Sequence, residues 1–160
     1  MEHLLRRAMQ DHGDTVYRLA LCRLQNRADA EDVYQDVFLR LLSQDAVCWD
    51  ENHLKAWLIR TTLNRCADVG RFRLRRSALP LSEIPDLPQQ TNEAAELWDA
   101  VAHLRPPFRD VVHLHYAEGY STEEIAALLG IPAATVRTRL HRARKQLKDL
   151  LGGNEDEESL

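Results

Sequence analysis

The amino-acid sequence predicts an all-α protein made of two small helical domains that are joined by a proline-containing linker. Two observations lead to this fold class. Apolar residues recur at spacings of three and four along most of the chain, and the alternating pattern typical of strands is missing. Gly and Pro are rare inside these periodic stretches, where the helix-favouring residues Leu, Ala, Arg and Glu dominate.

The linker is predicted at residues 77–92, where Pro80, Pro85 and Pro88 stand among polar residues. Proline lacks the amide hydrogen that a continuing helix needs, and this segment has too few apolar residues for a core strand. The first domain is therefore expected at residues 1–76 and the second at residues 93–152. Residues 153–160 are expected to form an acidic, disordered tail.

In the first domain, an amphipathic helix is predicted from about residue 28 to residue 42. Its apolar stripe has six members at helical spacing: Ala30, Val33, Tyr34, Val37, Phe38 and Leu41. The polar residues Asp29, Asp32, Gln35 and Asp36 lie on another face. Acidic side chains near the start of a helix also complement its dipole, so composition alone leaves both a solvated surface and a binding surface open.

A second helix is predicted from about residue 54 to residue 76. Its inward residues are Ile59, Leu63 and Cys66, and its polar stripe is Arg60, Asn64, Asp68, Arg71 and Arg75. The amide of Asn64 can donate to and accept from a base edge, whereas Arg60 and Arg65 suit phosphates. The cationic end of this helix also complements the helix dipole, which is the alternative interpretation.

The second domain begins with helical segments that provide a packing wall. Leu97, Val101 and Leu104 share one face, and the pair Pro106 and Pro107 then breaks the helix. The apolar pattern resumes with Val111, Val112, Leu114 and Tyr116.

A helix-turn-helix motif is predicted between Tyr120 and Leu151. Ser121 and Glu124 form a capping box, Gly130 ends the first helix, and Pro132 starts the second. The second helix buries Val136, Leu140, Ala143 and Leu147, and it leaves outside Arg137, Thr138, His141, Arg144, Lys145 and Lys148. Such guanidinium, hydroxyl, imidazole and ammonium groups contact bases and phosphates in a major groove. A solvated basic helix packed in a bundle is the alternative.

Charge is distributed unevenly along the chain. The net charge is -4, but residues 53–76 contain seven Lys or Arg against one Asp, and residues 132–151 contain six against one. The remainder of the chain is therefore strongly acidic. Two separate cationic segments are typical of a protein that binds a polyanion at two places.

The sequence also argues against several other classes of protein. A helix needs about eighteen consecutive apolar residues to cross a bilayer, and no stretch of this sequence approaches that length. The N-terminus also lacks the apolar run of a signal peptide. We therefore expect a cytoplasmic protein without membrane insertion. Cys22, Cys48 and Cys66 lack a metal-binding spacing and are expected to be buried thiols. With no recognisable nucleophile, metal or phosphate motif, we expect no catalytic residue, no metal, no cofactor and no enzymatic activity.

Several runs of residues resemble the bacterial extracytoplasmic-function (ECF) sigma factors of RNA polymerase. The runs Leu104–Ala126 and Leu129–Arg144 are similar to the fourth conserved region of that family. The run Asp29–Leu42 resembles the second conserved region, and Ala56–Asp68 resembles its minus-ten recognition segment. The resemblance implies a sigma factor that binds polymerase core and directs promoter recognition, with an anti-sigma factor as a further partner.

The resemblance also implies a role for particular residues. The residues expected to contact the upstream, minus-thirty-five element are Arg137, Thr138, His141, Arg142 and Lys145. The residues expected to contact the downstream element are Arg60, Asn64 and Arg65. The residues expected to bind the clamp helices of the largest polymerase subunit are Asp32, Gln35 and Asp36. The family traps a flipped base near the loop that holds Trp49, whose role stays open between stacking and burial, whereas Trp57 is expected in the core. The alternative function is a stand-alone helix-turn-helix transcriptional regulator that binds DNA without polymerase.

Overall fold

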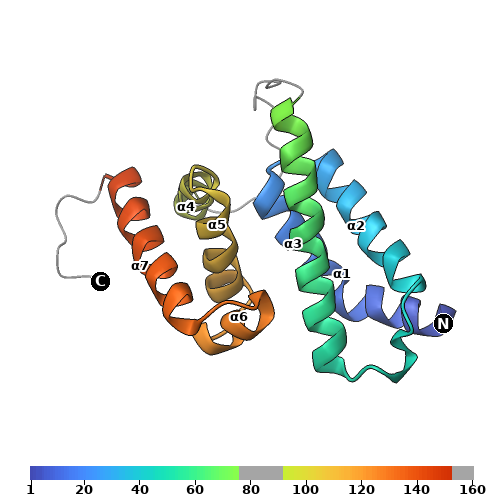
Figure 1. The fold of residues 1–160 in the computed structure, drawn as a ribbon. Coiled ribbons are helices and arrows are strands. Elements are labelled where there is room, and N and C mark those ends of the chain that lie inside the picture. Colours follow the sequence, from blue (N-terminus) through green and yellow to red (C-terminus); the bar gives the residue numbers. More distant parts are fainter. Residues whose placement is uncertain (76–91, 153–160) are drawn as a thin grey trace. The chain divides into compact units, whose positions relative to one another are not determined.

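The computed structural model describes residues 1–75 and 92–152. Within these ranges the chain forms helices and short turns without any strand, which confirms the prediction of an all-α fold (Figure 1). The chain divides into two compact units, Met1–Pro85 and Asp86–Leu160. The predicted linker, apart from Asn92, and the predicted acidic tail lie outside the described residues, so the predicted domain boundaries stay predictions.

The first unit is a bundle of three helices. They are α1 (Glu2–Leu24), α2 (Arg27–Leu42) and α3 (Glu51–Arg75), with a short 3-10 turn η1 (Ala46–Cys48) between α2 and α3. Helix α1 packs against both α2 and α3, and α2 packs against α3. Helix α1 is absent from the sequence predictions, although it supplies one third of the bundle.

The core of the first unit contains the apolar stripes that the sequence predicts. Of the α2 stripe, Val33, Val37, Phe38, Leu41 and Ala30 are buried, while Tyr34 is half-buried. The inward residues of α3, namely Ile59, Leu63 and Cys66, are also buried. Both Trp49 and Trp57 are half-buried and pack on the core. The ring of Trp49 also stacks on His53, with a centroid distance of 4.3 Å and an interplanar angle of 13°.

The prediction that all three cysteines are buried is wrong for Cys48. Cys22 and Cys66 are buried within helices, but Cys48 is exposed at the end of η1. In this three-residue turn only Ala46 enters the core. Helical periodicity therefore does not extend to Cys48.

The connection between α1 and α2 is short and well defined. Gln25 ends α1 in the left-handed conformation at φ 55°, which is uncommon for a residue other than glycine. Asn26 then caps α2 by accepting a hydrogen bond from the amide of Asp29 at 2.9 Å. This Asn cap makes α2 begin one residue earlier than predicted, at Arg27.

The second unit consists of α4 (Asn92–Ala102), α5 (Pro106–Val112), a π-helical turn η2 (His113–Ala117), α6 (Thr122–Leu129) and α7 (Ala133–Leu150). Helix α7 packs against α4, α5 and α6. The predicted break at Pro106 and Pro107 is confirmed, since these prolines start α5. The prediction that Leu97 and Tyr116 belong to the packing faces is wrong, because Leu97 is 41% exposed and Tyr116 is 56% exposed.

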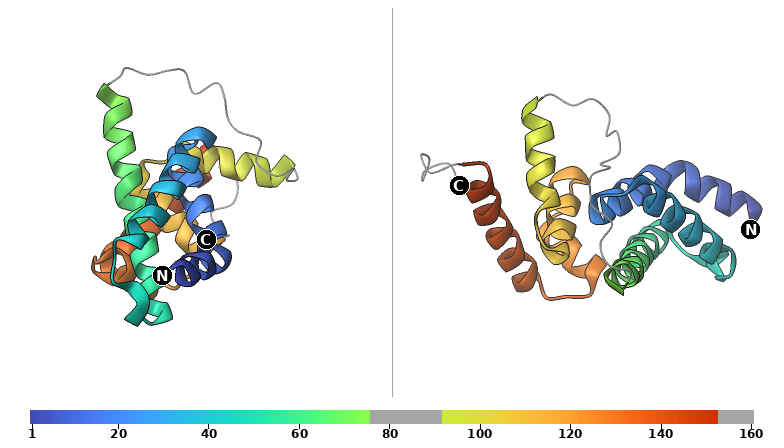
Figure 2. Two further views of the ribbon diagram at one scale, coloured as in Figure 1. Left: turned by 90° about the vertical axis from the view of Figure 1, so that its right-hand side faces the viewer. Right: turned by 90° about the horizontal axis from the view of Figure 1, so that it is seen from above.

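The helix-turn-helix motif is confirmed in its local details. Ser121 accepts from the amide of Glu124 at 3.1 Å, and the Glu124 carboxylate accepts from the amide of Ser121 at 3.0 Å. Gly130 ends α6 at φ 67°, a conformation that favours glycine, and Pro132 caps α7. Figure 2 shows α6 in orange and α7 in orange to red, joined by this short turn. No helix among the described residues is long and apolar enough to cross a membrane.

The packing of α1 on α2 yields a stability prediction at Gly13. A Cβ atom there would lie 3.0 Å from Oη of Tyr34. Burial, together with the charge of Asp14, raises the pKa of this Tyr34 hydroxyl. Gly13→Leu should lower the free energy of unfolding by about 1–3 kcal/mol or more through overpacking. Urea denaturation followed by circular dichroism measures the change.

Gly70 provides the matched control. It lies in α3, and an added Cβ would meet no atom within 4 Å. Gly70→Leu should therefore raise the free energy of unfolding by up to about 1 kcal/mol through helix propensity. An unchanged stability of Gly13→Leu would show that α1 does not pack on α2 in this register.

Candidate nucleic-acid interface

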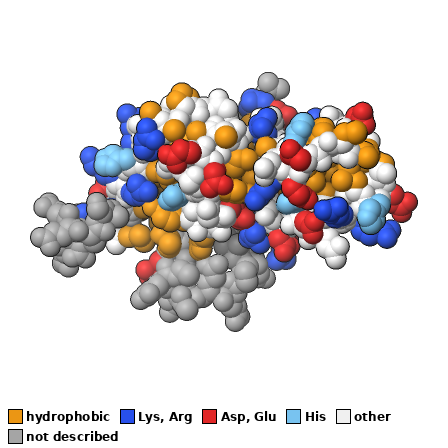
Figure 3. All heavy atoms as spheres, turned by 90° about the horizontal axis from the view of Figure 1, so that it is seen from below, with side chains coloured by type: hydrophobic (Ala, Val, Ile, Leu, Met, Phe, Trp, Pro, Cys, Tyr) orange, Lys and Arg blue, Asp and Glu red, His pale blue; other side chains and the backbone are white. Residues whose placement is uncertain are grey.

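The outward face of α7 is the first candidate surface. Val136, Leu140, Ala143 and Leu147 are buried, as predicted, and they attach α7 to its neighbours. The opposite side of the helix exposes Arg137, Thr138, His141, Arg142 and Lys145. Over α7, at the left of Figure 3, blue and pale-blue side chains lie next to one another. The arrangement is a helix held by one face that presents cationic and hydrogen-bonding groups on the other.

Two of these side chains have local partners. The Thr138 hydroxyl donates to the carbonyl of Ala134 at 3.0 Å, which fixes its rotamer and leaves its oxygen able to accept. Arg137 Nη1 lies 3.9 Å from Glu123 Oε1 in a long, exposed ion pair. The backbone amide of Glu123 lowers the pKa of its carboxyl, and the Thr122 hydroxyl and the charge of Arg137 lower it further. Arg137 therefore faces an ionised carboxylate at neutral pH.

Arg144 corrects the predicted outward set. Its side chain is half-buried, and Nε donates to Oη of Tyr116 at 2.6 Å. Its guanidinium carbon also lies 5.7 Å from the centre of the Tyr116 ring. Lys148 is half-buried as well. Tyr116 belongs to the π-helical turn, and the sequence did not indicate that it contacts α7.

The second candidate surface lies on α3. Arg60 and Asn64 are one helical turn apart and both are exposed, in agreement with their predicted stripe. Arg65 is different, because its side chain is only 28% exposed and lies between two carboxylates. Its Nε is 2.5 Å from Asp36 Oδ2, and its Nη1 donates to Asp68 Oδ2 at 2.9 Å.

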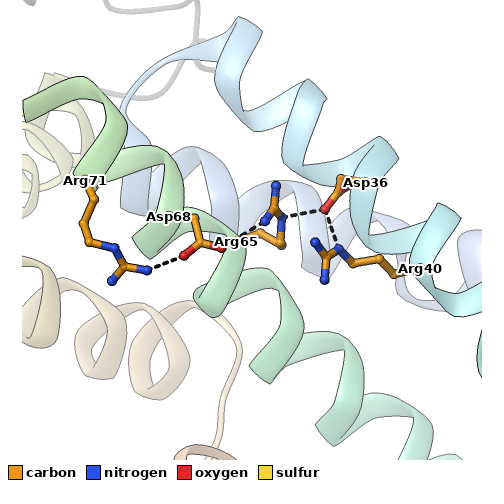
Figure 4. A network of polar contacts seen from close by, with 5 residues as sticks. All are labelled: Asp36, Arg40, Arg65, Asp68 and Arg71. Carbon is orange, nitrogen blue, oxygen red and sulfur yellow. Dashed lines mark hydrogen bonds and ion pairs between the residues drawn. The ribbon is translucent and has the colours of Figure 1, made fainter. Parts of the chain in front are cut away.

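The ion pairs of Arg65 belong to a five-residue network across α2 and α3 (Figure 4). Asp36 Oδ2 also accepts a hydrogen bond from Arg40 Nε at 2.8 Å, and Asp68 pairs with Arg71. The structure thus brings together Asp36, predicted to bind polymerase, and Arg65, predicted to bind DNA. Sequence reasoning placed them on separate surfaces.

The third candidate surface is the outer face of α2. Asp32 and Gln35 are exposed, and Asp36 is half-buried at its side. The same steps of four and three continue the face to Leu39 and Leu42, which are 64% and 40% exposed. Sequence reasoning missed these two residues, although their spacing from Gln35 was the available signal. The face is therefore acidic and polar at one end and apolar at the other.

Among the residues in the described ranges, no group of three or more His, Cys, Asp or Glu could hold a metal ion. His113 Nε2 does lie 3.1 Å from Glu118 Oε2, but both side chains are buried within the second unit. This pair is an internal contact of the second unit and is not part of the α7 surface.

Comparison with known proteins matches both units to family models. Residues 8–78 match Sigma-70 region 2, and residues 94–147 match Sigma-70 region 4. The ECF RNA polymerase sigma factor SigE of Mycolicibacterium smegmatis is 38% identical, over 93% of this chain and 62% of its own length. The ECF RNA polymerase sigma factor SigL of Mycobacterium tuberculosis is 33% identical, over 91% of this chain and 87% of its own length.

A solved structure shares the fold. The sigma factor RpoE of Bartonella quintana, in complex with the anti-sigma factor NepR, has a TM-score of 0.78 and 23% identity, covering 94% of this chain and 98% of RpoE. The two matched regions, in this order on one helical chain, define the sigma-70 class of transcription initiation factors. Within that class, the chain belongs to the family of ECF RNA polymerase sigma factors. The comparisons support the function of an alternative sigma factor and do not favour the stand-alone regulator.

The pairing of Glu123 with Arg137 generates a prediction for α7. Glu123→Gln removes a carboxylate that competes with DNA phosphate for Arg137, so the affinity for duplex DNA should rise by no more than about fivefold, as expected for an exposed pair. Fluorescence anisotropy with a labelled duplex measures it. The gain should vanish in Glu123→Gln/Arg137→Ala, and a gain that persists there would show that Glu123 acts without Arg137.

Proposed function

We propose that this chain binds RNA polymerase core through α2 and promoter DNA through α3 and α7, and so directs initiation at specific promoters. The observation that carries the proposal is the exposed face of α7, where five polar or cationic residues lie opposite a fully buried stripe. A helix in that position of a helix-turn-helix motif enters the major groove.

At the upstream element, α7 supplies both kinds of contact that duplex recognition needs. Arg137, Thr138 and His141 lie within the first half of α7, where its side chains reach base edges, and Arg142 lies beside them. Lys145 lies one turn beyond His141 and suits a flanking phosphate. Base contacts set the sequence preference, whereas phosphate contacts set the register and the salt dependence.

At the downstream element, α3 supplies Arg60 and Asn64 from one exposed stripe. The Asn64 amide can read a base edge in both directions, and Arg60 suits a phosphate one turn away. Arg65 is the third proposed contact. Because its guanidinium is ion-paired with two carboxylates, less of its charge is available to a DNA phosphate. The half-buried Trp49, stacked on His53, stands in the loop before α3.

Polymerase core is proposed to dock on the outer face of α2, through the clamp helices of its largest subunit. Asp32, Gln35 and Asp36 form the polar part of this surface. Leu39 and Leu42 extend it with apolar area, and an apolar centre beside polar groups is typical of protein interfaces. Leu39 and Leu42 are three positions apart on one helix face, so together they form a small contiguous apolar patch.

We further propose an anti-sigma factor as a regulatory partner, action in the cytoplasm, and no catalytic activity of the chain itself. RpoE of Bartonella quintana, which has the same fold, is in complex with the anti-sigma factor NepR. A sigma factor acts by directing polymerase, so neither a catalytic residue nor a cofactor is needed for this role.

Reconstitution with polymerase core tests the proposed function directly. The purified chain should bind core, and the complex should give promoter-dependent products in run-off transcription. Promoter templates come from mapping transcript starts after overexpression. A chain that binds duplex DNA but neither binds core nor supports any product would be a stand-alone regulator.

The α2 surface is tested by Leu39→Ala. Its side chain is 64% exposed, so the fold should be unaffected, whereas core affinity should fall by about 1–2 kcal/mol if this leucine is buried at the interface. Leu150→Ala is the matched control, an exposed leucine on α7 at 51%. Equal core affinity of the two variants would remove Leu39 from the docking surface.

The α7 surface is tested by comparing Arg137→Ala with Lys145→Ala. Selection of bound duplexes from a random pool should show that Arg137→Ala loses preference at one upstream position, worth about 1–3 kcal/mol for a bidentate contact. Lys145→Ala should instead weaken all sequences alike and reduce the salt slope by about 0.9. Unchanged selectivity in Arg137→Ala would exclude Arg137 from base recognition.

A further inference from the structure

The contact between Asp36 and Arg65 joins the two proposed binding surfaces of the first unit. Asp36 lies on α2, which is proposed to bind polymerase, and Arg65 lies on α3, which is proposed to bind DNA. Figure 4 shows the two side chains pointing toward each other, with Arg65 Nε 2.5 Å from Asp36 Oδ2. A side chain that is fully occupied by one partner has less to offer to a second.

Arg65 is substantially occupied in this structure. Two of its three nitrogens face carboxylates, since Nε pairs with Asp36 and Nη1 with Asp68. Arg60 and Asn64 on the same helix are exposed, whereas the Arg65 side chain is 28% exposed. A DNA phosphate that approaches Arg65 would have to compete with these two carboxylates, each of which is already ion-paired with its guanidinium.

Asp36 is occupied on one side only. Its Oδ2 accepts a hydrogen bond from Arg40 Nε and lies 2.5 Å from Arg65 Nε in an ion pair, and neither of these contacts involves Oδ1. The side chain of Asp36 is 36% exposed, beside Asp32 on the face of α2. A cationic group of the polymerase can therefore reach this carboxylate and compete for it.

We propose that Asp36 is a positioning residue that holds Arg65 away from DNA until polymerase core engages the α2 surface. This inference rests on the proposed function and adds a coupling between its two binding events. When a cation of core takes Asp36, the Nε side of Arg65 becomes available to a phosphate, while Asp68 keeps the guanidinium anchored on α3. The Asp36 side chain is 36% exposed, so a cationic group of core can approach it from solvent and take the place of Arg65. Coupling of this kind is reciprocal, and DNA bound at Arg65 favours the core-bound state of Asp36.

The first measurement uses the free, full-length chain and a labelled single-stranded oligonucleotide at several salt concentrations. Arg65→Gln should leave the affinity of the otherwise unchanged chain almost the same, because Arg65 is held by Asp36. Asp36→Asn should raise the affinity and steepen the salt slope by about 0.7, the value for one additional phosphate contact. When the salt is diluted about fourfold, the ratio of the affinity of Asp36→Asn to that of the unchanged chain should then increase by roughly 2.5-fold. Asp36→Asn/Arg65→Gln should lose the gain.

Two further variants separate positioning from general electrostatics. Glu31→Gln removes the same charge from an exposed position of α2 and should not steepen the slope. Asp36→Glu keeps a carboxylate beside Arg65, so the DNA affinity of the free chain should not show the gain expected for Asp36→Asn. A slope change in Glu31→Gln as large as in Asp36→Asn, or a gain that survives Arg65→Gln, would overturn the proposal.

The second measurement repeats the comparison in the presence of saturating core, with a downstream promoter fragment. Here Arg65→Gln should lower DNA affinity, by about the gain seen for Asp36→Asn in the free chain. An effect of Arg65→Gln that is equal with and without core would contradict the coupling. If the unchanged chain fails to bind core at all, the proposed function itself fails. If core binding is normal but the effects of Asp36→Asn and Arg65→Gln on DNA affinity are additive in the double variant, only the role of Asp36 is rejected.

Discussion

A helix that buries one stripe of apolar side chains must turn its opposite face to solvent, and this constraint places every candidate surface in the protein. In α7, Val136, Leu140, Ala143 and Leu147 are fixed in the core, so the remaining sides of the helix can carry polar groups without loss of packing. In α2, the buried stripe around Val37 leaves Asp32 and Gln35 outside in the same way. The identity of the buried residues thus determines which residues can bind a partner.

The parts of the fold that depend on this periodicity could be predicted from the sequence. Ser121 and Glu124 fixed the start of α6, and Gly130 fixed its end, because each of these signals acts within a few residues. The stripes of α2, α3 and α7 followed from spacing alone. Helix α1 was missed, although Val16, Leu19 and Ala20 have helical spacing, because its stripe carries buried small residues, such as Ala8 and Gly13, that give a weak apolar signal.

The contacts between elements could not be predicted, because they depend on how helices pack rather than on local sequence. The pairing of Asp36 with Arg65 joins residues from α2 and α3 and needs the register of one helix against the other. The hydrogen bond from Arg144 to Tyr116 depends on the π-helical turn, because this turn shifts the position of Tyr116 relative to a regular helix. The same turn begins at His113, whose buried partner Glu118 directly follows the turn. The composition of the chain and the spacing of its residues do not indicate these contacts between side chains.

These contacts also make the two cationic surfaces unequal, although the sequence gives them similar charge. On α7, the Glu123 carboxylate that pairs with Arg137 is exposed and lies at 3.9 Å, so salt and DNA phosphate can displace it readily. On α3, Arg65 faces two carboxylates at 2.5 and 2.9 Å and is largely sheltered from solvent. The face of α7 is therefore prepared for a polyanion in the free chain. The α3 surface gains its full charge only if another group takes over one of those carboxylates, which makes its affinity dependent on what α2 contacts.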